Sequence, residues 1–231
     1  MGRLLALTFA VGLVLGSGAG ATGPGFRATS FVSRVDNPWF PLVPGTVYVY
    51  TGAKDGKSSR DVVTVTHTTR QISGVTATEL KDDLYVEGRL EERTTDWYAQ
   101  DRTGNVWYLG ESTAELDKSR HVTSREGTWL AGRNGAQPGI YMPAHPAVGR
   151  SARQEYLKGH AEDHFRVVSL TASVSSPYVS SKHALLTQEW TPLEPGVLDH
   201  KLYVRGIGTV FEQTEKGAVE RNELVSVTRG G

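Results

Sequence analysis

The sequence predicts an all-β protein, in which one strongly curved antiparallel sheet forms a half-barrel or a partly closed barrel after a cleaved signal peptide. Apolar and polar residues alternate over short segments, which is typical of strands with one buried face. Turn signals separate these segments, among them Asp55-Gly56 and Glu87-Gly88. Helical periodicity is nearly missing, and only residues 112–120 could give two helical turns. About ten short strands at regular spacing therefore favour a curved sheet.

The first predicted strands lie between residues 45 and 101. In the first of them, Val47 and Val49 alternate with Tyr48 and Tyr50, and the Asp55-Gly56 pair would then turn the chain back. Alternation of the same kind predicts the next three strands at residues 60–72, 74–86 and 89–101.

The later part of the chain mixes strands with a long loop. Residues 102–105 predict a tight turn into a strand at 106–112, and residues 121–132 could add another strand. Gly and Pro are frequent in residues 133–149, which predicts a long loop. The remaining segments are expected at 152–176, as one long strand or a bent pair, and at 184–193, 200–215 and 220–229.

The beginning of the sequence has the pattern of a secretory signal peptide. Arg3 precedes an apolar run, Leu4–Leu15, and small residues follow up to Ala21. The run is shorter than the roughly 20 residues that span a bilayer, and no Cys is present to take a lipid. We therefore predict a signal peptide at 1–21, a flexible segment at 22–36 and a single β domain at 37–231. The predicted location is secreted or periplasmic, without stable insertion into a membrane.

Composition excludes several functions. The chain has 25 basic and 25 acidic residues, so it has no overall charge that would attract nucleic acid. It has no Cys, which rules out disulfides, thiol catalysis and cysteine zinc sites. Phosphate-binding loops and the Gly-x-Ser-x-Gly elbow are also missing. At roughly 210 residues, the mature chain is large enough to bury a core without disulfides.

A candidate metal or catalytic site lies in residues 155–168. If this segment is one strand, Tyr156, His160, Glu162 and His164 share a face. Imidazole and carboxylate groups suit a divalent metal such as zinc, so the two histidines and Glu162 are candidate ligands. Without a metal, either histidine could act as a base and Tyr156 as an acid. The alternative is a polar strand face in contact with water.

A candidate ligand-binding site lies on the strand at 89–101. Asp96, Tyr98 and Gln100 share one face, and Trp107 lies on the next strand. Aromatic rings stack on sugar faces while carboxylates and amides bond to hydroxyls, so the pattern suits a glycan, although the rings could equally belong to the core. Three other candidates complete the set: His145, which lies between two prolines, Trp190 and Tyr203.

Four segments resemble bacterial secreted proteins and lipoproteins of an uncharacterised family. They are the opening NPWFPLVPGTVYVYTG at 37–52, DWYAQDRTGNVWYLGE at 96–111, EWTPLEPGVLDHKLYV at 189–204 and the closing segment at 203–226. The resemblance implies a twisted antiparallel half-barrel similar to the lipoprotein carriers LolA and LolB, which hold acyl chains in the concavity of the sheet. It implies no established reaction.

The sequence leaves three functions open. The first is a secreted protein that binds a small apolar molecule or a glycan in the concave face of the sheet. The second is an extracellular lyase or hydrolase acting on polysaccharide, with help from a metal or without it. The third is a structural or interaction protein of the cell envelope. The oligomeric state is not predicted.

Overall fold

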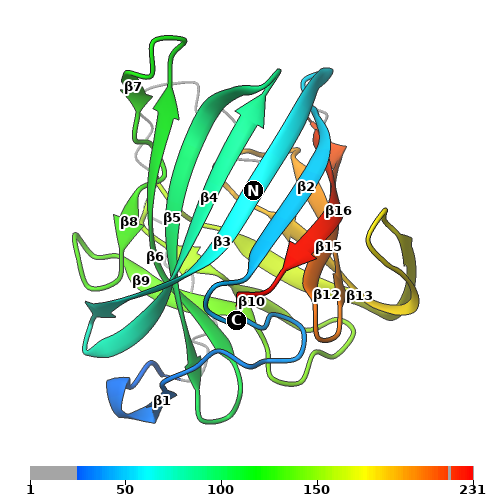
Figure 1. The fold of residues 1–231 in the computed structure, drawn as a ribbon. Helices are drawn as coiled ribbons and strands as arrows, with labels where there is room; N and C mark the ends of the chain where they lie inside the picture. Colours follow the sequence, from blue (N-terminus) through cyan, green and yellow to red (C-terminus); the bar gives the residue numbers. More distant parts are fainter. Residues whose placement is uncertain (1–24, 218–219, 231) are drawn as a thin grey trace.

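The computed structural model describes residues 25–217 and 220–230, and one antiparallel sheet that nearly closes into a barrel dominates it (Figure 1). The predicted all-β fold class is confirmed. The predicted signal peptide at 1–21 lies outside the described residues. The longer strands are β2 (Val47–Lys54), β3 (Lys57–Ile72), β4 (Val75–Val86), β5 (Arg89–Asp101), β6 (Val106–Leu116), β12 (His164–Ser175), β13 (Ser180–Trp190), β14 (Leu198–Val204), β15 (Gly208–Lys216) and β16 (Glu220–Thr228).

The shorter elements decorate or join this sheet. They are the 3-10 turn η1 (Ala28–Ser30) and the strands β1 (Phe31–Val32), β7 (Val122–Ser124), β8 (Trp129–Leu130), β9 (Gln137–Met142), β10 (Ser151–Arg153) and β11 (Glu155–Tyr156).

The sheet starts and ends on the same short stretch of chain. Its order is β10-β12-β13-β14-β15-β16-β2-β3-β4-β5-β6-β9-β11. β10 pairs with β12 at one end and β11 pairs with β9 at the other, and only Gln154 separates β10 from β11. A Cβ atom on Gly139 would lie 2.2 Å from the carbonyl oxygen of Arg153, so a glycine is needed where β9 meets this stretch. The two edges of the sheet thus come together and nearly close the barrel.

Tight turns with left-handed backbone create the long hairpins. Asp55 and Gly56 have φ of 50° and 75°, and Glu87 and Gly88 have φ of 50° and 77°. Positive φ at both central residues is the geometry of the type I′ turn, whose twist matches that of the strands. Both predicted turns are therefore confirmed, and they place the β2–β3 and β4–β5 hairpins at the same end of the barrel (Figure 1).

Two local predictions were wrong, and of the two alternatives for residues 152–176 the single long strand was wrong. Residues 112–120 form no helical turns, because β6 continues to Leu116 and Asp117 then accepts backbone hydrogen bonds from Ser119 and His121 in a turn. The predicted loop at 133–149 contains β9, whose Ile140 is buried in the core. The predicted strand through residues 155–168 is interrupted, because a turn brings Leu157 and Ala161 together.

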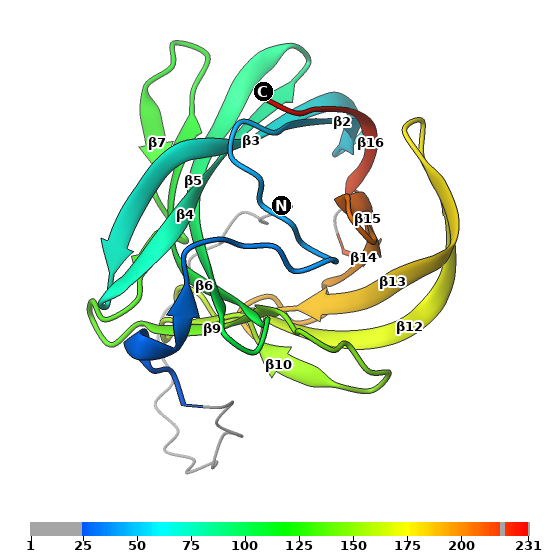
Figure 2. The same ribbon diagram turned by 60° about the horizontal axis from the view of Figure 1, so that its bottom comes forward.

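One end of the barrel is filled by its own N-terminal segment. Residues 33–46 cross that end, as Figure 2 shows. Trp39 and Phe40 are buried there, and Phe40 lies 4.6 Å from Tyr141 and 5.2 Å from Tyr98 between ring centroids. Gln100 fixes the segment, because its side-chain oxygen accepts hydrogen bonds from the backbone amides of residues 36 and 37 at 3.0 and 2.7 Å. We call this the plugged end.

Residues 25–32 lie outside the barrel wall. β1 pairs with the end of β5, and the rings of Phe26 and Phe31 lie 5.6 and 6.0 Å from the Trp107 ring. Part of the segment predicted to be flexible is therefore packed against the barrel. In the part of the chain that the structure describes, there is no helix of the length and apolar character needed to cross a membrane.

Candidate ligand-binding site

Carboxylates enter the barrel because they share the alternation of core residues. On β3, Asp61 falls in phase with Val65, which is fully buried. On β4, Asp82 falls in phase with Leu80, and on β5 Asp96 is fully buried beside the core. The interior of the barrel is consequently apolar near the plugged end and acidic further along.

Aromatic rings form the layer next to the plugged end. Tyr98 and Tyr108 stack with ring centroids 4.7 Å apart, and Tyr141 meets Tyr98 edge-on at 4.9 Å. Trp129 adds an edge contact to Tyr108 at 5.2 Å. This layer separates the plugged end from the rest of the interior, and the hydroxyl of Tyr108 contacts the carboxyls of Asp96 and Glu111.

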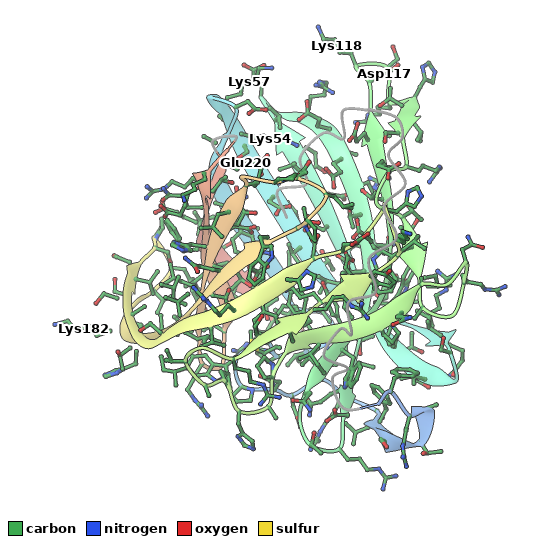
Figure 3. All side chains as sticks on the ribbon, turned by 180° about the vertical axis from the view of Figure 1, so that it is seen from behind. Lys54, Lys57, Asp117, Lys118, Lys182 and Glu220 are labelled. Atoms are coloured by element: carbon green, nitrogen blue, oxygen red, sulfur yellow. The ribbon has the colours of Figure 1, made fainter. Side chains whose placement is uncertain are left out.

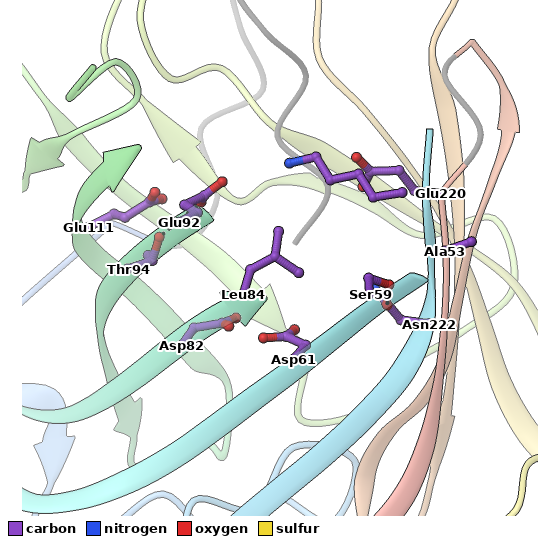
Figure 4. Close-up of a pocket in the computed structure, with 11 residues that line it drawn as sticks. Ala53, Ser59, Asp61, Asp82, Leu84, Glu92, Thr94, Glu111, Glu220 and Asn222 are labelled. Carbon is purple, nitrogen blue, oxygen red and sulfur yellow. Dashed lines mark hydrogen bonds between the residues drawn. The ribbon is translucent and has the colours of Figure 1, made fainter. Parts of the chain in front are cut away.

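A narrow pocket lies beyond this layer, toward the end with the β2–β3 and β4–β5 hairpins, which we call the open end. Figure 4 shows its lining side chains converging from β2, β3, β4, β5, β6 and β16. The space open to the centre of a water-sized sphere is about 10 Å³, on the order of one water molecule. Five of its lining residues are acidic and one is basic: Asp61, Asp82, Glu92, Glu111, Glu220 and Lys54.

Asp61 and Asp82 form a carboxyl pair on the floor of the pocket and point toward each other in Figure 4. They are 5% and 8% exposed. Burial, the charge of Asp82 and a hydrogen bond with Asp82 raise the pKa of Asp61 well above its usual range. No amide, hydroxyl or ammonium donor among the described residues reaches Oδ1 of Asp61. The raised pKa favours the protonated form of Asp61, because a neutral carboxyl is less costly to bury beside Asp82 than a second negative charge.

The hydroxyl of Tyr108 bridges Asp96 and Glu111. It lies within hydrogen-bond distance of an oxygen of Asp96 and 2.7 Å from Oε2 of Glu111. A hydroxyl has one hydrogen, so it can donate to only one of these two carboxyls at a time. Burial and both carboxylates raise the pKa of Tyr108 well above its usual range, which keeps the phenol neutral.

Lys201 forms a separate ion-pair network with two carboxylates on the other side of the interior. Its ammonium lies 3.0 Å from Glu189 and 3.4 Å from Glu212. Burial opposes the charge of Lys201, but the two carboxylates outweigh it and hold the lysine pKa well above its usual range. Glu189 also accepts hydrogen bonds from Tyr203 and Thr187 at 3.1 and 3.0 Å. Lys201 and Glu189 therefore have ion-pair and hydrogen-bond partners within the protein.

The rim of the open end carries Glu220 and Lys54, which face each other across β16 and β2 (Figure 3). Burial raises the pKa of Glu220 to about 7, although the charge of Lys54 opposes this. The ammonium of Lys54 lies 4.0 Å from Glu91 on β5, with β3 and β4 between the two strands in the sheet, so the lysine side chain reaches over the pocket. Burial also raises the pKa of Asp199, on β14, to about 6.

The predicted ligand-binding residues lie in different parts of the structure, some inside the barrel and some outside it. Asp96, Tyr98 and Tyr203 lie inside the barrel, each at most 1% exposed. Gln100 is also buried, but its amide holds the plugged end. The other three lie elsewhere: Trp107 under the N-terminal segment, His145 on an exposed loop and Trp190 on the outer wall. Whether any of the seven binds a ligand stays a prediction.

The predicted metal or catalytic residues do not share one strand face. His160 is exposed in a turn, where its Nδ1 lies 3.1 Å from Glu126. Glu162 accepts a hydrogen bond from the Gly159 amide in the same turn. His164 begins β12, and its ring stacks on Trp190 at 5.7 Å. β11 has only two residues and is followed by a turn. The continuous strand that would have placed these side chains on one face is therefore not formed.

This arrangement gives the metal prediction no support, because within residues 25–217 and 220–230 no three His, Asp or Glu side chains are grouped to hold a metal ion. Tyr156 and His164 both lie next to Arg153, whose guanidinium sits 4.2 Å above the Tyr156 ring. The catalytic roles of Tyr156, His160 and His164 stay predictions without a supporting geometry.

Sequence reasoning missed Asp61, Asp82, Glu92 and Glu220 as site residues. A signal for them exists, because each falls in the buried phase of its strand instead of the exposed phase. A carboxylate in that phase is expensive to bury unless it is paired or protonated. The pairing itself depends on register between strands, which the sequence alone does not specify.

Comparisons with known proteins give no family. No protein-family model and no curated protein matches the chain. One similar solved structure is named an exported protein with a YmcC-like fold from Bacteroides fragilis; it is 16% identical, with 83% of this chain and 99% of that chain covered and a TM-score of 0.46. Another is named a lipoprotein from Parabacteroides distasonis, at 11% identity, 83% and 99% coverage and a TM-score of 0.44. Likenesses this distant leave the function to be argued from the site.

Proposed function

We propose that this chain is an exported binding protein that holds a small polar molecule, or the polar end of a larger one, at the open end of its barrel. The observation that carries the proposal is the pocket at that end, where side chains from six strands converge on one narrow space. Barrel mouths are frequent ligand sites, because a rigid wall presents many side chains to one point. Export is expected from the signal-peptide pattern at 1–21.

The lining of the pocket argues for a polar ligand. Eight of its eleven residues are acidic, amide or hydroxyl types, and Leu84 is the largest apolar side chain among them. An acyl chain would offer these groups no hydrogen bonds and would remove water from them, which costs about 1–3 kcal/mol for each group without a partner in the protein. The apolar ligand that the carrier resemblance implied is thus disfavoured, whereas the polar alternative, a glycan included, is kept.

A melting experiment tests this function. The protein would be heated with three sets of compounds: fatty acids, neutral sugars and glycans, and small amines and polyols. We expect at least one polar compound to raise the melting temperature, and the fatty acids to leave it unchanged. A shift given by fatty acids alone would overturn the proposal.

A further inference from the structure

We propose that the molecule held at the open end is an organic cation, bound through an ammonium or guanidinium group, and that Lys54 occupies the place of this group in the unliganded protein. This inference rests on the proposed function, because it names the ligand class of the same pocket.

The charge of the pocket provides the first argument. Five carboxyl groups line it against the single ammonium of Lys54. On the opposite side of the interior, by contrast, a buried ammonium contacts the carboxylates directly, since Lys201 lies within 3.4 Å of both Glu189 and Glu212. Nothing comparable balances Asp61, Asp82 and Glu92 among the described residues. A ligand that brings a positive charge would recover the attraction that this lining offers.

The second, independent argument is an unused acceptor. Oδ1 of Asp61 is buried and receives no hydrogen bond from an amide, hydroxyl or ammonium group of the described residues; the carboxyl pairs only with Asp82, toward which it points on the pocket floor in Figure 4. Buried acceptors are nearly always paired, so an unpaired one in a pocket marks a position for a donor. An ammonium or guanidinium carries several donors and a positive charge, so it could both donate to this oxygen and offset the excess of carboxyls.

The position of Lys54 provides the third argument. Its side chain is 15% exposed and spans from β2 to Glu91 on β5, although the distance of 4.0 Å is long for a strong ion pair. A lysine that reaches over an acidic pocket and makes only a weak pair is replaced at small cost. A metal ion is a poorer fit than an organic cation, because the described residues contain no group suited to hold one.

Titration calorimetry at pH 8 tests the inference with two probes of equal length, 1,5-diaminopentane and 1,5-pentanediol. We expect the diamine to bind and the diol to give no heat. Lys54→Met removes the competing ammonium and is expected to tighten diamine binding by about threefold to tenfold. Lys57→Met, an exposed lysine on the same hairpin, is the matched control and should leave the affinity unchanged.

Asp61→Asn/Asp82→Asn is expected to weaken diamine binding by about thirtyfold or more, because the partner charges of the ligand are lost. Both amides fit the volume of the acids, and the melting temperature of the variant reports whether it is folded. Diamine binding that Lys54→Met weakens would overturn the role of Lys54.

The two proposals fail in different ways. Binding of the diol, a sugar or Ca²⁺, with no binding of the diamine, would overturn the inference and leave a small-molecule binding protein. If none of the compounds binds, and the protein purified from its exported form releases no small molecule on heating, both proposals are wrong.

Discussion

The two ends of the barrel differ in how their buried polar groups are paired. At the plugged end, the chain covers the opening itself, and the Gln100 amide accepts hydrogen bonds from two backbone amides of the crossing segment and donates one to Asp36. At the open end, the same sheet lines the pocket with five carboxyls, and Lys54 is the single cation among the lining residues. The comparison shows which end serves stability and which is free for function, because unbalanced buried charge lowers stability. Substitutions of the buried groups should therefore lower the free energy of unfolding at the plugged end, whereas removing a buried carboxyl should raise it at the open end.

The largest expected effect is at the plugged end. Phe40→Ala removes a buried ring that contacts Tyr98 and Tyr141. We expect the free energy of unfolding to fall by about 3–5 kcal/mol, since a cavity is left in the core. Denaturation in urea measures this, and Val43→Ala, at a side chain that is 51% exposed, serves as control. A loss below about 1 kcal/mol would mean that the segment only lies over the barrel end.

The next effect concerns the polar fastening of the same segment. Gln100→Leu leaves the amides of Asp36 and Asn37 without their acceptor. We expect a loss of about 2–3 kcal/mol, because these donors lose a hydrogen bond in a partly or fully buried place. Gln188→Leu, which breaks an exposed hydrogen bond with Arg166, provides the comparison in the same denaturation experiment. Equal losses for the two variants would contradict this role of Gln100.

At the open end, we expect a substitution to raise the free energy of unfolding instead of lowering it. Asp61→Asn keeps the shape of the side chain and removes a carboxyl that must hold a proton to stay buried. We expect the variant to be more stable than the parent at pH 8 by about 1 kcal/mol. Thermal melting at pH 8 measures it. A clear loss of stability would mean that the charge of Asp61 is already balanced in the folded protein.

The smallest expected effect comes from the rim. The pKa of Glu220 is raised from 4.5 to about 7 in the folded protein, so the folded state keeps a proton that the unfolded chain releases above 4.5. The stability that this proton provides is complete below pH 4.5 and is lost as the pH rises through 7. Glu220→Gln should remove less than about 1 kcal/mol of this pH dependence, because the rim is screened by water. Melting curves between pH 4.5 and 8 measure the change, and an unaltered slope would exclude Glu220 as its source.

The fold was more predictable than the site. Alternation in segments such as Val47–Tyr50 and turn pairs such as Asp55-Gly56 are local signals, and they were sufficient for an all-β curved sheet. The site depends on register between strands, which brings Asp96 opposite Glu111 and Asp61 beside Asp82. His160 and His164 illustrate the limit, because the turn at Leu157–Ala161 separates residues that an unbroken strand would have aligned.

Tyr98 and Tyr203 show what alternation can and cannot provide. Both were predicted to be ligand-binding residues from their residue type and neighbours, and both lie inside the barrel. Trp107 and Trp190 carry a similar pattern but lie on the outer wall, because the direction of a strand face depends on how the whole sheet curves. Aromatic content alone therefore could not separate the inside from the outside.

The most direct test of the account is the pH dependence of stability in the parent protein and in Asp61→Asn/Asp82→Asn. Because the open end buries Asp61 with a pKa well above its usual range, the melting temperature of the parent should fall as the pH rises from 5 to 8, and most of this fall should disappear in the variant. A melting temperature that does not fall over this range, or that falls equally in both proteins, would contradict the central claim.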